Sequence, residues 1–170
     1  MKDFFIGKIS WPKARKSFLV LLFGQILLLL ASCGNDLDIP DQMLQGKING
    51  ETWTYGAANA FRISANGQFE AKFLSNLENV NDPCALPSPG LTHVKAIFTP
   101  AIRDYTIFPQ AIDPNQVQVA FQVTPSNTLI ATNGFMNIFD INNSFAIGYL
   151  QAELDDGNMV EGSFELQFCN

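Results

Sequence analysis

The chain has 170 residues, of which 16 are acidic, 10 are basic and one is a histidine. A net negative charge repels phosphate backbones, so nucleic acid is excluded as a partner. A single histidine leaves little material for a Ser-His-Asp site or a zinc site.

The first 32 residues predict a secretory signal peptide, which we expect to form a helix. Several Lys and Arg residues precede an apolar run over residues 18–30, and this run ends in Leu30-Ala31-Ser32-Cys33. The order of basic, apolar and small-residue segments is typical of export signals. A permanent membrane helix is the alternative, but it needs roughly 20 apolar residues and the run has about 15.

The residues Leu30, Ala31, Ser32 and Cys33 resemble the lipobox of bacterial lipoproteins. The resemblance implies that Cys33 becomes the N-terminus of the mature protein and carries acyl chains such as palmitate. Several chains together make membrane attachment effectively permanent. An ordinary signal peptide with a chance cysteine is the alternative. Removal of residues 1–32 would leave five basic and fifteen acidic residues, so we expect membrane contact through the acyl chains alone.

Three segments are therefore expected along the chain. Residues 1–32 form the signal peptide, and residues 33–42 are the lipidated cysteine and a polar, Pro-broken tether. From Met43 onward the apolar period is close to two, and Gly, Pro, Asn and Asp interrupt it at short intervals. Residues 43–170 are thus predicted to form a single all-β domain.

Two strands are the clearest. Residues 117–124 place Val119, Phe121 and Val123 on one face, and residues 159–169 do the same for Phe164, Leu166 and Phe168. These six residues are predicted to lie in the core, because one face of a half-buried strand is apolar. Further strands are expected at residues 61–64, 68–74, 93–98, 105–108, 128–132, 135–141 and 145–154.

Turn residues support the same architecture. Asn49-Gly50, Asn66-Gly67 and Asp156-Gly157 are typical of tight hairpins, because they tolerate positive φ angles. The sequence predicts an antiparallel sandwich or barrel of about nine or ten strands, and strand spacing does not decide between the two.

Cys84 and Cys169 are the two cysteines that remain after residue 33. An even pair in an exported chain predicts a disulfide, and two unpaired buried thiols are the alternative. The alternation of the last strand points Cys169 outward, so the bond would hold the long connection over residues 76–91 on the outside of the sheet.

The region after Cys33 resembles a group of small outer-membrane lipoproteins of unknown function in Gram-negative bacteria. The resemblance rests on Asn49-Gly50 followed by Trp53, on Asp82-Pro83-Cys84, and on a final strand with Gly162, Phe164 and Cys169. It implies the fold, the disulfide and the location, and it implies no activity.

Few residues suggest chemistry. His93 is expected to be a surface or partly buried strand residue, and no serine has a nucleophile-elbow context. No metal ion, cofactor or catalytic residue is expected. Trp53 and Tyr55 share one face of a strand and are the candidate ligand contacts, as a stacking platform for a sugar or peptide. A staple at the end of a sandwich is the alternative.

The sequence therefore favours a non-catalytic, lipid-anchored module of the cell envelope that binds a glycan, a peptide or an envelope protein through its loops. A structural envelope lipoprotein without a specific ligand is the second hypothesis, and a glycan-directed hydrolase is the third. The expected location is the outer membrane, facing either the periplasm or the cell surface.

Overall fold

The computed structural model describes residues 42–75, 82–85, 92–110 and 112–169. The predicted signal peptide and Cys33 lie outside these residues. No helix among the described residues is long and apolar enough to cross a membrane. The described residues form one short 3-10 helix, η1 (Pro83–Ala85), and ten strands: β1 (Gln45–Ile48), β2 (Glu51–Arg62), β3 (Phe69–Ser75), β4 (His93–Phe98), β5 (Arg103–Ile107), β6 (Gln116–Thr124), β7 (Asn127–Ile130), β8 (Asn133–Ile141), β9 (Phe145–Asp155) and β10 (Asn158–Cys169).

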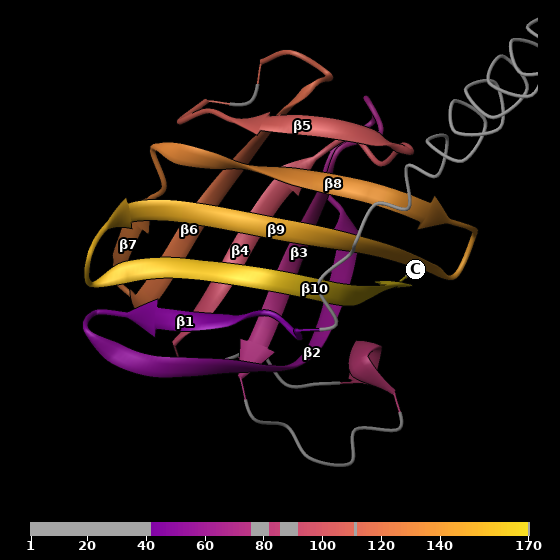
Figure 1. The fold of residues 1–170 in the computed structure, drawn as a ribbon. Coiled ribbons are helices and arrows are strands. Elements are labelled where there is room, and N and C mark those ends of the chain that lie inside the picture. Colours follow the sequence, from indigo (N-terminus) through magenta and orange to yellow (C-terminus); the bar gives the residue numbers. More distant parts are fainter. Residues whose placement is uncertain (1–41, 76–81, 86–91, 111, 170) are drawn as a thin grey trace, which may run out of the picture. The chain divides into compact units, whose positions relative to one another are not determined.

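The strands form a closed barrel (Figure 1). Their order is β4-β3-β2-β1-β10-β9-β8-β5-β6-β7, and β4 also pairs with β6. That additional pairing closes a ring of nine strands and leaves β7 as an extra strand on β6. Closure is what distinguishes a barrel from a sandwich, because it removes free sheet edges. The predicted all-β class is confirmed, and the structure selects the barrel.

Most strand pairs are antiparallel, as predicted, but two are parallel. β2 and β10 both run antiparallel to the short strand β1, so they are parallel to each other and pair directly beyond the start of β1. β5 and β6 are parallel over two residue pairs, which join the last two residues of β5 to the first two of β6. The purely antiparallel expectation was therefore wrong, and the barrel is mixed.

The predicted Asn49-Gly50 hairpin joins β1 to β2, and its two residues have φ angles of 55° and 79°. Positive φ at both positions is what a two-residue type I′ turn requires. The Asp156-Gly157 turn between β9 and β10 has no positive φ angle. There the Asp155 carboxylate accepts hydrogen bonds from the Gly157 N–H and the Asn158 amide.

β2 is one strand of twelve residues, where the sequence predicted separate strands around Trp53 and at residues 61–64. The register with β3 shifts between Tyr55 and Ala57. This β-bulge moves Ala58 and Ala60 onto the core face and interrupts the period of two. The interruption explains why one long strand was predicted as two short ones.

The barrel interior is a packed apolar core. Val119, Phe121 and Leu166 are fully buried and Phe164 is 2% exposed, as the alternation predicts. Val123 and Phe168 are partly buried and pack against the same core, so all six predicted core residues are confirmed as core contacts. Aromatic rings meet edge to face across the interior, as in the pair Phe73–Phe164 with centroids 5.0 Å apart.

Candidate functional site

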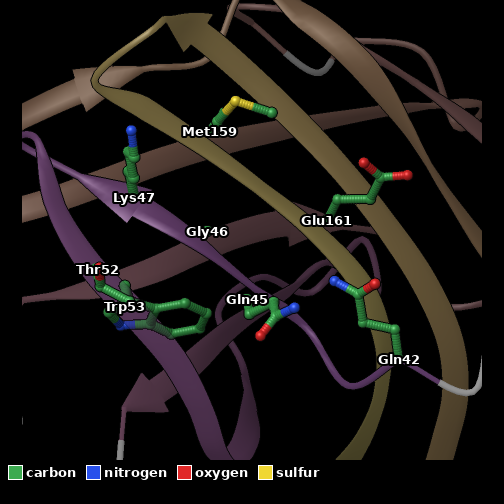
Figure 2. Close-up of a pocket in the computed structure, with 8 residues that line it drawn as sticks. All are labelled: Gln42, Gln45, Gly46, Lys47, Thr52, Trp53, Met159 and Glu161. Carbon is green, nitrogen blue, oxygen red and sulfur yellow. The ribbon is translucent and has the colours of Figure 1, made fainter.

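A cavity of about 380 Å³ opens over β1, where this strand lies between β2 and β10 (Figure 2). We call it the β1 groove. The groove is lined by Gln42, Gln45, Gly46, Lys47, Thr52, Trp53, Met159 and Glu161. In Figure 2 the side chain of Lys47 points away from Trp53 and Gln45. The groove thus combines an aromatic ring, a thioether, two amides and charges of both signs.

Gly46 is what allows β1 to lie so close to β10. It pairs with Trp53 on one side and with Val160 on the other. A Cβ atom at Gly46 would lie 2.0 Å from the backbone oxygen of Met159, which is far inside contact distance. Because only glycine fits, no side chain at this position fills the groove.

Trp53 is 4% exposed, and its Nε1 has no hydrogen-bond partner among the described residues. A second cavity of about 290 Å³ also borders this residue, and its other lining residues are Ile48, Glu51, Thr52, Thr54, Ser75 and Thr92. A buried donor without an acceptor costs about 1–3 kcal/mol. Trp53 therefore borders two cavities, and its indole donor has no acceptor among the described residues.

Tyr55 is separate from this groove, although it was predicted together with Trp53. The two side chains share the inward face of β2, as expected, but Tyr55 packs against the core. Its hydroxyl donates a hydrogen bond to the backbone oxygen of Glu165 on β10. Burial raises the pKa of Tyr55 to about 12. The structure thus brings Trp53, but not Tyr55, to the lining of the groove.

Glu161 links the groove to the neighbouring strand β9. The hydroxyl of Tyr149 donates a hydrogen bond to a carboxylate oxygen of Glu161. Desolvation and this bond raise the pKa of Tyr149 to about 12, because both favour the neutral phenol. The carboxylate is thereby held in one orientation at the edge of the groove.

The predicted disulfide joins Cys84 and Cys169, with Cα atoms 5.5 Å apart. Cys169 lies on the outward face of β10 by its alternation and is nevertheless 6% exposed. The helix η1 explains this burial, since it carries Cys84 and its Pro83 oxygen accepts a hydrogen bond from Asn59 at 3.1 Å. The bond therefore fastens η1 to the outside of the barrel, as predicted.

The remaining candidate residues bear on chemistry and anchoring. His93 is buried, with 5% exposure, so the expectation of a surface or partly buried histidine was wrong. Within the part of the chain that the structure describes, no group of three His, Cys, Asp or Glu side chains could hold a metal ion. Leu30, Ala31, Ser32 and Cys33 lie outside the described residues.

Of the residues that line the groove, the sequence pattern identified only Trp53, and it did not identify Gln42, Gln45, Gly46, Lys47, Thr52, Met159 and Glu161. The alternation placed Glu161 on an outward face, which is where the structure has it. Alternation does not tell which strand is the neighbour of which. The neighbours β1 and β10 are more than one hundred residues apart in the sequence, so their pairing was not visible in the alternation. Gly46 was a signal in the sequence for this pairing, because a residue that lies so close to its partner strand cannot carry a side chain.

Comparison with known proteins gives no relative: no protein-family model, no curated protein and no solved structure matches the chain.

Proposed function

We propose that this chain is a lipid-anchored, non-catalytic binding module of the cell envelope, and that it binds its ligand in the β1 groove. The export signal and the lipobox resemblance at Cys33 support the anchor and the outer-membrane location. The observation that carries the binding role is Trp53, a nearly buried indole that borders two cavities and whose N–H has no partner among the described residues.

The chemistry of the groove supports binding over catalysis. A ligand oxygen that accepts from Trp53 Nε1 would offset the cost of the unpaired donor, while the ring and Met159 supply apolar contact. Proton transfer needs an acid or base that is free to reach the substrate. The carboxylate in the groove is that of Glu161, and it already accepts a hydrogen bond from Tyr149. The groove lies on strands, whereas the sequence favoured loops as the place where a ligand binds.

The test uses Trp53 as its own reporter. The chain has two tryptophans, Trp11 and Trp53, so a Trp11→Phe background leaves Trp53 as the sole emitter. Titration with soluble neutral oligosaccharides and with short peptides should give a saturable change in emission for one class. The bound compound should be recovered intact, since no turnover is expected.

A matched variant separates the hydrogen bond from the ring. Trp53→Phe keeps an aromatic side chain and removes the N–H, so calorimetry should show affinity reduced by about fivefold to tenfold. Ser126→Ala, in the turn between β6 and β7, removes a polar group outside both cavities and serves as the control. Unchanged affinity in Trp53→Phe, or no emission change with any compound, would contradict the proposal and favour a structural envelope protein.

A further inference from the structure

The outer face of four neighbouring strands carries two rows of side chains next to the β1 groove. Strand pairing places Glu161 (β10), Gln151 (β9), Phe135 (β8) and Thr106 (β5) in the first row. It places Ser163, Tyr149, Asn137 and Asp104 of the same strands in the second. Strands lie about 4.8 Å apart, so each row spans about 14 Å. The first row continues into the groove, because Gln45 of β1 pairs with Glu161.

Two aromatic rings form the centre of this face. Phe135 and Tyr149 stack with their centroids 5.7 Å apart and an interplanar angle of 26°. Phe135 is 41% exposed, so much of its ring is available to a ligand. Exposed rings on a rigid sheet offer a large apolar surface at little cost in conformational entropy.

The polar groups around the rings offer both donors and acceptors. Tyr149 donates to Glu161, and the Asn137 amide donates to Asp104, so each of these carboxylates has a fixed orientation. The Asn137 carbonyl oxygen is buried and has no partner among the described residues. Gln151 adds an amide and Thr106 adds a hydroxyl in the first row. Such a mixture matches a ligand whose own groups both donate and accept.

Charge restricts the ligand further. The 67 residues from Asp104 to Asn170 contain eight acidic residues and no Lys, Arg or His. This segment supplies β8, β9 and β10 in full, so these three strands have acidic groups without basic ones, and the basic residues at the borders of the face are Arg103 of β5 and Lys47 of the groove. An anionic ligand would be repelled. The ammonium groups of a cationic ligand only donate hydrogen bonds, so they would use the acceptors of the face and leave its amide and hydroxyl donors without a role.

We propose that this face binds a neutral oligosaccharide, which lies across the strands from the β1 groove to the Phe135–Tyr149 pair. The C–H face of one sugar packs on the aromatic pair, while hydroxyls of the chain meet Gln151 and Glu161. This inference rests on the proposed binding function and names the ligand class of that site. Glu161 belongs to both parts, since it lines the groove and accepts from Tyr149.

The experiment uses the full chain in the Trp11→Phe background. The probes are linear neutral pentasaccharides of glucose, xylose and mannose, an oligogalacturonate as the anionic probe, and hexalysine as the cationic one. A neutral pentasaccharide should change Trp53 emission and release heat in calorimetry, whereas oligogalacturonate should do neither. Phe135→Ala and Tyr149→Ala should each weaken this binding by about tenfold. Tyr149→Phe, which keeps the ring, should weaken it less.

Phe61→Ala is the matched control, because Phe61 is a similarly exposed aromatic (38%) that lies on β2 beside Cys169. Its affinity should equal that of the parent chain. Binding that reaches Trp53 but is unchanged in Phe135→Ala and Tyr149→Ala would overturn this inference and leave the groove as a binding site. Salt-sensitive binding of hexalysine without any neutral sugar would overturn it in favour of a basic protein partner. Absence of all binding would overturn both proposals.

Discussion

At the scale of single residues, the hydroxyl of Tyr105 organises the connection between β4 and β5. The residue is fully buried, and its ring packs edge to face on Phe98 at a centroid distance of 5.8 Å. The hydroxyl faces the Thr99 and Ala101 oxygens at 2.8 and 2.9 Å and accepts from the Ala101 N–H at 2.8 Å. The hydroxyl of one side chain is thus within hydrogen-bond distance of the backbone groups of Thr99 and Ala101.

Replacing Tyr105 by Phe should therefore lower the free energy of unfolding by about 1–3 kcal/mol, since it removes the hydrogen-bond partner of the partly buried backbone groups of Thr99 and Ala101. Denaturant unfolding measures the change. Tyr149→Phe is the control, because it removes a hydroxyl from the outer face and should cost less than about 1 kcal/mol. Equal losses in the two variants would contradict the role assigned to the Tyr105 hydroxyl.

The aromatic core residues permit a second prediction. Phe121→Ala and Phe164→Ala should each cost about 3–5 kcal/mol, because they leave cavities between packed strands. Phe135→Ala, at an exposed position, should change stability by less than about 0.5 kcal/mol. Equilibrium unfolding in urea compares the three. A small loss for Phe121→Ala would mean that the barrel interior is not closely packed.

All three tyrosines of the chain have a raised pKa, and burial is the main cause in each. The pKa is about 12 for Tyr55 and Tyr149, and that of Tyr105 is raised above its ordinary value of 10.0. The folded protein should show little tyrosinate absorbance at pH 10, where the unfolded chain is half ionised. Because the unfolded state loses these protons first, stability should fall as the pH rises from about 10 toward 12. A normal tyrosinate titration in the folded state would contradict this.

Some residue assignments could be made from sequence and others could not. Alternation identified the core residues, because one face of each strand is apolar. It misjudged His93, which lies on the outward face of β4 with Lys95 yet is buried. Alternation reports the face of a strand and is silent about what covers that face, so the burial of His93 and Cys169 was beyond its reach.

At the scale of elements, the strands themselves were largely predictable. β4 occupies residues 93–98 as expected, and β6 and β10 differ from the prediction by one residue each. The pairing was not predictable, because the parallel contact of β2 with β10 depends on the short length of β1 rather than on any local pattern. The β1 groove arises from the pairing of β1 with β2 and β10, so only its Trp53 was identified.

The disulfide joins η1 to the end of β10 across a sequence separation of 85 residues. In the chain-entropy model its loss should lower the free energy of unfolding by about 4–5 kcal/mol. The variant Cys84→Ala/Cys169→Ala, compared with the oxidised parent chain, tests this in guanidinium unfolding. The parent chain treated with reductant should resemble the variant. A loss below about 1 kcal/mol would show that the barrel closes without help from this bond.

At the scale of the whole molecule, we expect Cys33 to be the acylated N-terminus of the mature protein. Mass spectrometry of detergent-extracted protein should find a chain that begins at Cys33 and carries acyl mass. Cys33→Ala should move the protein from the membrane fraction to the soluble fraction or leave the precursor uncleaved. A mature chain that begins at another residue would end the lipoprotein interpretation.

β1 is also the point where mechanical load on the N-terminal segment would enter the barrel. Gln42 and Leu44 are held to Ser163 by two backbone hydrogen bonds of 2.9 Å, and Leu44 is held to Tyr55 by a third of the same length. Eight residues separate Cys33 from Gln42, and among the described residues these three bonds are the first that tension from a fixed Cys33 would reach. Since Gln42 and Gln45 line the β1 groove, stretching would distort the wall of the groove together with the buried Leu44. A ligand held there would dissociate faster under pulling, as in a slip bond.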